Sequence, residues 1–274
     1  MKNIKYILLI LTTFFFASCE EVIDVDLNTA PPRLAVDASI DWVRGTDGSE
    51  QKITLTTTGS YYENTVPVAS GATVFITNST STVFDFIEIP GTGEYVCTNF
   101  EPVIGETYVL TIVYDGETYT ASEKLFPVPE IASIVQDNEG GFTGDNIELR
   151  YYFQDDGAEN NFYLARVDTN IYPFPEYGAI KDEFEQGNLM SAIVSDEDFK
   201  AGDSVDFKLY GISERYYNYM SIIISMVEGG AGSGPFQTPP VNARGNIVNQ
   251  TNEKNFAMGY FRLGEVDASN YVIQ

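Results

Sequence analysis

From residue 33 onward, apolar and polar residues alternate with a period of two, which is typical of strands with one buried face. The apolar runs are short, rich in β-branched and aromatic residues, and separated by turn residues such as Asp115-Gly116. The strands that we expect in this first part are 34–36, 53–58, 72–77, 83–89, 94–98, 108–114 and 118–122. Seven short strands in about a hundred residues predict an immunoglobulin-like β-sandwich over residues 33–126.

A second β-rich domain is predicted over residues 127–274. Two prolines in 126–129 interrupt any strand ladder and favour a domain boundary there. Further strand-like runs follow at 131–135, 147–153, 162–168, 205–210, 256–263 and 271–273. Between them, residues 213–228 carry apolar side chains at three- and four-residue steps, and two glycines follow. We therefore expect a mainly β protein with one substantial helix, packed on a sheet.

The first residues have the graded pattern of an export leader. Two lysines precede an apolar run that is too short for a permanent transmembrane helix. Two small residues then stand directly before Cys19, an order that resembles the lipobox of bacterial lipoproteins. This predicts a signal peptide over 1–18, acylation of Cys19, and a tether over 19–32. Several acyl chains, at about 0.8 kcal/mol per buried methylene, would hold the protein on a membrane. The alternative is an ordinary secretory leader.

Composition narrows the function classes. The chain has 40 acidic and 15 basic residues and a net charge of −25, so it repels phosphate backbones, and we expect no nucleic-acid binding. It contains no histidine, which removes the commonest general base and nearly every zinc constellation. Once Cys19 is acylated, Cys97 is the only other cysteine, so no intramolecular disulfide can form. We expect no catalytic residues, no metal and no cofactor.

One segment combines three aromatic residues with two prolines. Residues 171–178 are not expected to form a regular ladder, and loops that carry aromatics often contact a partner or a sugar. Tyr172, Phe174 and Tyr177 are therefore the candidate contact residues for a partner or ligand. The alternative is a loop that folds its aromatic side chains back over its own domain.

Two acidic stretches resemble calcium loops without matching one. Residues 155–160 and 137–141 bring oxygen ligands together but lack the alternating spacing and closing glutamate of an EF-hand, so polar turns explain them better. Paired carboxylates for glycoside hydrolysis cannot be located by spacing, because that geometry is tertiary.

The C-terminal part resembles a known family. Residues 234–247, Gly-Pro-Phe-Gln-Thr-Pro-Pro-Val-Asn-Ala-Arg-Gly-Asn-Ile, followed by Gly-Tyr-Phe at 259–261, are similar to the closing signature of a Bacteroidota lipoprotein family, domain-of-unknown-function family 4249. Segments 32–36, 68–74, 93–95 and 105–110 agree with it. The resemblance implies an outer-membrane lipoprotein, often encoded beside a TonB-dependent transporter and without an established activity.

Two shorter matches point to the same phylum. The acids after Cys19 partly resemble the export signal that sends its lipoproteins to the outer face, and Asp203-Ser204-Val205 resembles its O-glycosylation acceptor.

From the residues and the resemblance we expect a lipid-anchored, cell-surface exposed accessory or binding protein of the outer membrane. It would work without catalysis beside a TonB-dependent β-barrel transporter in nutrient capture, because the lipid raises its effective concentration near that partner. Two alternatives remain open. One is a surface glycan hydrolase with two converging carboxylates of raised pKa in the second domain. The other is a structural or adhesive surface lipoprotein.

Overall fold

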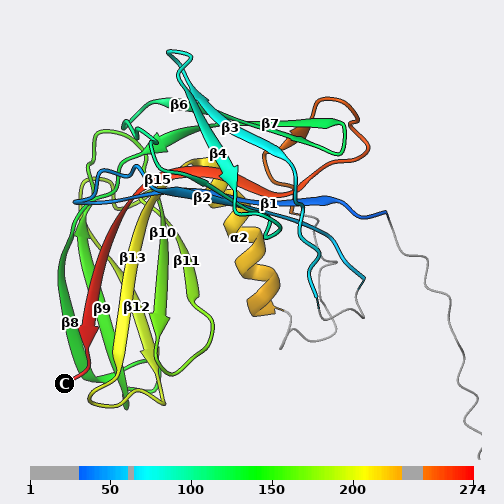
Figure 1. Ribbon diagram of the computed structural model, residues 1–274. Coiled ribbons are helices and arrows are strands. Elements are labelled where there is room, and N and C mark those ends of the chain that lie inside the picture. The colour runs from blue at the N-terminus through cyan, green and yellow to red at the C-terminus, as the bar shows by residue number, and fades with distance from the viewer. Residues whose placement is uncertain (1–30, 61–64, 230–242) are drawn as a thin grey trace, which may run out of the picture. The chain divides into compact units, whose positions relative to one another are not determined.

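The computed structural model describes residues 31–60, 65–229 and 243–274 (Figure 1). The predicted signal peptide, Cys19 and most of the predicted tether lie outside these residues. Residues 32–274 form one compact unit. The described part is mainly β with one helix, α2 (Glu214–Gly229), as the sequence predicted. None of its helices is long and apolar enough to cross a membrane.

Eight strands pair into a closed sheet, which we call the ring. In spatial order they are β15 (Met258–Val272), β1 (Leu34–Val43), β2 (Gln51–Thr57), β5 (Glu94–Cys97), β4 (Val83–Glu88), β3 (Thr73–Asn78), β6 (Thr107–Tyr114) and β7 (Glu117–Phe126). The short pairing of Leu263 and Gly264 with the end of β7 closes the sheet. One apolar core fills the ring, because alternate residues of each strand face inward.

The ring corrects the expected immunoglobulin-like sandwich over 33–126. All seven strands expected there exist, and Asp115-Gly116 forms the tight turn between β6 and β7, both residues having positive φ. The eighth strand, however, comes from the C-terminal end of the chain: residues 258–266 pair in parallel with β1. Local hydrophobic pattern carries no information about a partner more than 200 residues away, so the sequence did not predict closure.

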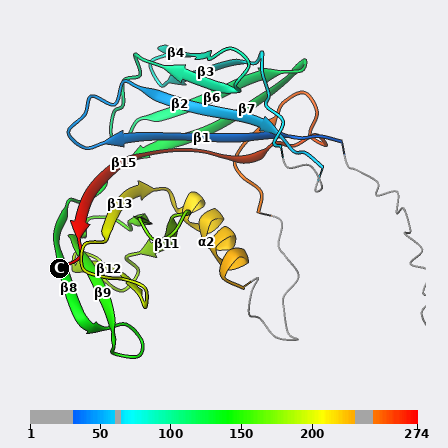
Figure 2. The same ribbon diagram turned by 60° about the horizontal axis from the view of Figure 1, so that its bottom comes forward.

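Two facing sheets follow the ring, and we call them the sandwich. The sheet that continues from the ring contains β11 (Glu176–Lys181), β10 (Phe162–Thr169), β13 (Ser204–Ile212) and the last residues of β15. The other contains β12 (Leu189–Asp196), β9 (Asn146–Gln154) and β8 (Ile131–Gly140). A second apolar core, which includes Tyr151, Phe153 and Phe207, lies between them. Figure 2 shows α2 beside the sandwich, and its Tyr216 and Met220 belong to a third cluster with residues of β10 and β13.

Strand β15 belongs to both parts. Its residues 258–266 pair with β1 in the ring, and its residues 266–272 pair with β13 in the sandwich. The sequence predicted two separate strands, 256–263 and 271–273, where the structure has one. The two expected domains, an immunoglobulin-like sandwich over 33–126 and a β-rich domain over 127–274, are therefore joined by β15, which pairs with strands of both. Strands β11, β12 and the short β14 (Val248–Asn249) were not predicted.

Polar side chains of β15 hold the connection between β7 and β8, at the residues where β15 passes from the ring to the sandwich. The Glu265 carboxylate accepts a hydrogen bond from the Val128 backbone N–H at 3.0 Å, and Asp267 accepts one from Ile131 at 2.7 Å. Arg44 pairs with Glu265 at 3.2 Å and also donates to the Val128 carbonyl. These bonds attach the proline-containing connection between β7 and β8 to β15, so that connection is not a free linker.

An ion pair with one buried partner lies on the opposite face of β15. The side chain of Arg262 is 9 % exposed, and its guanidinium pairs with Asp41 of β1 through contacts of 2.5 and 3.2 Å. It also lies 4.9 Å from the ring centroid of Tyr210 and 5.6 Å from that of Tyr216. Burial would lower the pKa of Arg262, but the Asp41 carboxylate raises it, so the arginine stays charged. Leaving the Arg262 guanidinium unpaired here would destabilise the fold strongly, because it is buried.

The segment before β15 packs by backbone contact. A Cβ atom on Gly245 would lie 1.6 Å from the carbonyl oxygen of Gly259, so only glycine fits. The next residue, Asn246, is buried, and its side-chain amide donates to the Phe261 carbonyl at 2.7 Å while its Oδ1 accepts from the Phe261 N–H at 2.9 Å. The Asn246 side chain thus hydrogen-bonds the backbone N–H and carbonyl of Phe261 as a neighbouring strand would.

We predict that Gly245→Ala lowers the free energy of unfolding by about 3 kcal/mol, or prevents folding, because the backbone of β15 must move. Gly178→Ala in β11 is the matched control, since its Cβ would meet no atom closer than 3.8 Å. We expect the control to change stability by about 0.5 kcal/mol or less. Urea denaturation of both variants measures the difference, and equal stabilities would contradict the close packing.

Candidate functional site

The aromatic segment divides between a turn and a strand. Tyr172 and Phe174 lie in the turn between β10 and β11 and are 41 % and 80 % exposed. The Tyr172 hydroxyl donates to Asp196 Oδ2 at 2.9 Å, and this bond raises the pKa of Tyr172 to about 12. Tyr177 differs, because it lies in β11 opposite Arg166 of β10 and is half-buried. The expectation that 171–178 forms no ladder is therefore wrong for 176–178, which follow the last proline.

The turn and the start of β1 lie at opposite ends of β15. Ala35 pairs with Met258 at the N-terminal end of β15, whereas β10 ends at Thr169, opposite Val205, which pairs with Tyr271. At roughly 3.3 Å per residue, Met258 and Tyr271 are about 40 Å apart along the strand. The long strand thus separates the aromatic turn from the point where the chain enters the ring (Figure 1).

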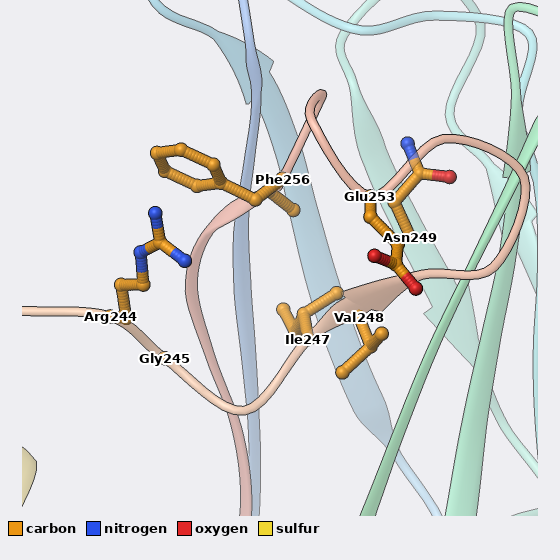
Figure 3. A pocket seen from close by; sticks show the side chains of 8 residues that line it. Arg244, Gly245, Ile247, Val248, Asn249, Glu253 and Phe256 are labelled. Atoms are coloured by element: carbon orange, nitrogen blue, oxygen red, sulfur yellow. The ribbon is translucent and has the colours of Figure 1, made fainter.

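A cavity of about 210 Å³ lies beside the first residues of β15, at the ring (Figure 3). Its lining residues are Arg244, Gly245, Ile247, Val248, Asn249, Glu253, Phe256 and Ala257. Figure 3 shows Arg244 and Phe256 together on one side and the Glu253 carboxylate on the other, with Ile247 and Val248 between them. One wall is therefore cationic, the opposite wall is anionic, and the floor is aliphatic.

Two guanidinium groups lie on the ring of Phe256. The Cζ atom of Arg33 is 3.8 Å from the ring centroid and that of Arg244 is 4.3 Å from it. Arg33 also donates to the Lys254 carbonyl at 3.1 Å and to the Phe256 carbonyl at 3.5 Å. Arg33 therefore positions Phe256, whose ring in turn orients the exposed Arg244 through a cation–π contact.

One carboxylate organises the loop that carries Glu253. Glu117, at the start of β7, accepts hydrogen bonds from the side chains of Asn249, Asn252 and Asn255 at 2.9, 3.2 and 2.6 Å. It also accepts one from the Tyr119 hydroxyl at 2.7 Å. The Tyr119 bond, followed by those of the asparagines, holds the pKa of Glu117 below its usual value. The loop is thereby fixed before any ligand arrives.

The sequence did not identify this cavity, although it contained two signals. Arg244 is one of only 15 basic residues in an acidic chain, and it stands directly before Gly245 in the stretch that resembles the family signature. Asparagines also recur at three-residue steps, at 246, 249, 252 and 255. The last three of these asparagines bond to Glu117, whereas Asn246 bonds to the backbone of Phe261.

The expected hydrolase alternative requires two converging carboxylates, one of them with a raised pKa. Within the described residues, a raised carboxyl pKa is found at Glu123, where burial is the cause. Glu123 lies in β7 of the ring rather than in the second domain, and it accepts hydrogen bonds from Ser213 at 3.0 Å and Tyr260 at 3.2 Å. A hydrolytic site would need a second acid beside it.

In the calcium-like stretch 155–160, the first carboxylate is hydrogen-bonded within the fold. Buried Asp155 accepts bonds from the Tyr163 hydroxyl at 2.6 Å and from the backbone N–H groups of Gly157 and Gly187, which is the geometry of a polar turn. Among residues 31–60, 65–229 and 243–274, no cluster of three acidic or cysteine side chains that could hold a metal ion is found.

Cys97 is a buried free thiol, and burial raises its pKa, which makes it unreactive. Ser204, the acceptor of the O-glycosylation resemblance, begins β13, and its half-buried hydroxyl accepts a bond from Asn270 at 2.9 Å.

Comparisons with solved structures give distant likenesses. A two-domain fibronectin type III segment of chicken tenascin is 10 % identical over 66 % of this chain and 90 % of that chain, with a TM-score of 0.22. A DUF4785 family protein from Legionella pneumophila is 8 % identical over 65 % of this chain and 52 % of that chain, with a TM-score of 0.27. A chain of a cytokine receptor complex is 7 % identical over 64 % of this chain and 82 % of that chain, with a TM-score of 0.26.

No curated protein matches the sequence. A family model described as "Domain of unknown function (DUF4249)" matches residues 20–269, which is nearly the whole chain after the predicted leader. The chain belongs to the DUF4249 family.

Proposed function

We propose that the protein is a lipid-anchored, non-catalytic accessory protein of the bacterial outer membrane, and that it works beside a TonB-dependent β-barrel transporter in nutrient capture. Acylated Cys19 would hold it in the plane of that barrel on the cell surface. Confinement of both proteins to one surface raises their effective concentration, so a modest contact suffices for association.

The separation along β15 is the observation that carries this proposal. The chain enters the ring beside Met258, whereas exposed Tyr172 and Phe174 lie near the other end of the same strand. A tether at one end and exposed aromatic side chains at the other suit a protein that presents a contact surface away from its anchor. Aromatic side chains supply much of the binding energy at protein interfaces.

A neighbouring turn enlarges the contact surface. Asp196, which accepts the Tyr172 hydroxyl bond, ends β12 and pairs with Ile147, just after the turn between β8 and β9. Phe142 in that turn is fully exposed. Two turns at this end of the sandwich therefore carry exposed aromatic rings beside the carboxylates of β12 and its following turn. Such a surface fits a partner that offers apolar contacts bordered by basic groups.

The test is affinity purification of the tagged, lipidated full chain from detergent-solubilised outer membranes, with quantitative mass spectrometry of the co-purifying proteins. We expect a TonB-dependent transporter with the unmodified chain. The double variant Tyr172→Ser/Phe174→Ser should recover at least about tenfold less of it, because two exposed aromatic contacts are lost.

Phe184→Ser is the matched control. Phe184 is 90 % exposed but follows the other end of β11, so its replacement should leave recovery unchanged. Equal recovery with the double variant would remove the aromatic turn from the interface, and the absence of any transporter with the unmodified chain would overturn the proposal itself.

A further inference from the structure

We infer that the cavity at the start of β15 binds a small zwitterionic ligand, namely a free aliphatic α-amino acid. The ligand's carboxylate would lie at Arg244, its ammonium group at Glu253 and its side chain on Ile247 and Val248. This site is in the ring and does not involve the aromatic turn. It therefore stands independently of the proposed transporter contact.

The cationic wall is suited to a carboxylate. In the described part of the chain, neither Arg33 nor Arg244 has a carboxylate within 4.0 Å, although acids outnumber bases 40 to 15. Arg33 is committed to the backbone carbonyls of the loop. Arg244 is exposed, and its planar guanidinium presents paired N–H donors that match a carboxylate. A bound anion would also reduce the repulsion between the two guanidinium groups on Phe256.

The opposite wall and the floor define the rest of the ligand. Glu253 lines the cavity across from Arg244, so it can accept hydrogen bonds from an ammonium group (Figure 3). Between them lie buried Ile247 and Ala257 and half-exposed Val248, which offer an apolar surface. A ligand with an acid, an amine and an aliphatic group within one residue's length satisfies all three surfaces together.

The size of the cavity limits the ligand. Its volume of about 210 Å³ is below the range of roughly 300–1,000 Å³ that is usual for drug-sized ligands. A single amino-acid residue fits that space, whereas an oligosaccharide would remain largely outside. A longer peptide is not expected to bind in the same way, because its terminal residue carries only one of the two charged groups.

The site is fixed in advance, which favours binding. Three asparagine amides hold the loop of Glu253 on Glu117, and Arg33 holds Phe256. Side chains and loops that are already ordered lose less conformational entropy when a ligand binds.

The probe is L-leucine, with two analogues that each lack one charged group. 4-Methylpentanoate keeps the carboxylate, and 3-methylbutylamine keeps the ammonium group. Isothermal titration calorimetry on the full chain in detergent measures all three. We expect L-leucine to bind at least tenfold more tightly than either analogue. No binding of L-leucine, or equal binding of an analogue, would overturn the inference.

Two charge-neutralising variants assign the walls. Arg244→Gln should weaken L-leucine binding about tenfold without changing the binding of 3-methylbutylamine, and Glu253→Gln should weaken L-leucine without changing 4-methylpentanoate. Both side chains are exposed, so we expect the variants to fold. Arg215→Gln on α2 and Glu139→Gln on β8 are matched exposed controls that should bind as the unmodified chain does. Unchanged L-leucine affinity in Arg244→Gln or Glu253→Gln would contradict the assignment.

Discussion

The backbone ladder of β15 is the constraint on which the rest of the structure depends. Its first residues complete the ring between β1 and β7, and its last residues complete one sheet of the sandwich beside β13. A strand that changes partners along its length must satisfy both ladders without a break, because unpaired backbone groups in a buried strand are costly. The two apolar cores are therefore joined by continuous hydrogen-bonded backbone rather than by a linker.

This constraint explains where glycine and buried charge occur. Gly245 and Gly264 lie where β15 contacts other backbone segments so closely that a Cβ atom would overlap a carbonyl oxygen. Arg262 and Asp41 pair across β15 and β1, where the third apolar cluster begins. The close glycine contacts and the Arg262–Asp41 pair both fix the register of β15. A shift by one residue would send Arg262 to the other face of the sheet.

The sequence predicted the individual strands, the turn and the helix better than it predicted the closure of the ring by β15. Seven of the eight strands of the ring, the Asp115-Gly116 turn and the helix α2 follow from side-chain periodicity and turn residues, which act over a few positions. The pairing of β1 with residues 258–266 and the capture of the 127–130 connection by Glu265 and Asp267 depend on contacts across the whole chain. No local pattern encodes them.

The same distinction applies to the candidate sites. Exposed Tyr172 and Phe174 follow from proline and aromatic content, whereas half-buried Tyr177 depends on its pairing with β10. The cavity was not predicted because its lining residues, all within 244–257, are held in place by Arg33 at the start of the described chain and by Glu117 of β7. These supporting residues are far from 244–257 in sequence, and Arg33 reaches Phe256 because β15 returns to β1.

The most direct test of the account asks whether ring and sandwich unfold together. Trp42, the single tryptophan, lies in β1 and reports on the ring by fluorescence, while hydrogen–deuterium exchange of β9 and β10 reports on the sandwich. Because β15 belongs to both parts, we expect the two signals to share one urea midpoint in the full chain. Loss of protection in β9 and β10 at a urea concentration that leaves Trp42 fluorescence unchanged would contradict the role of β15.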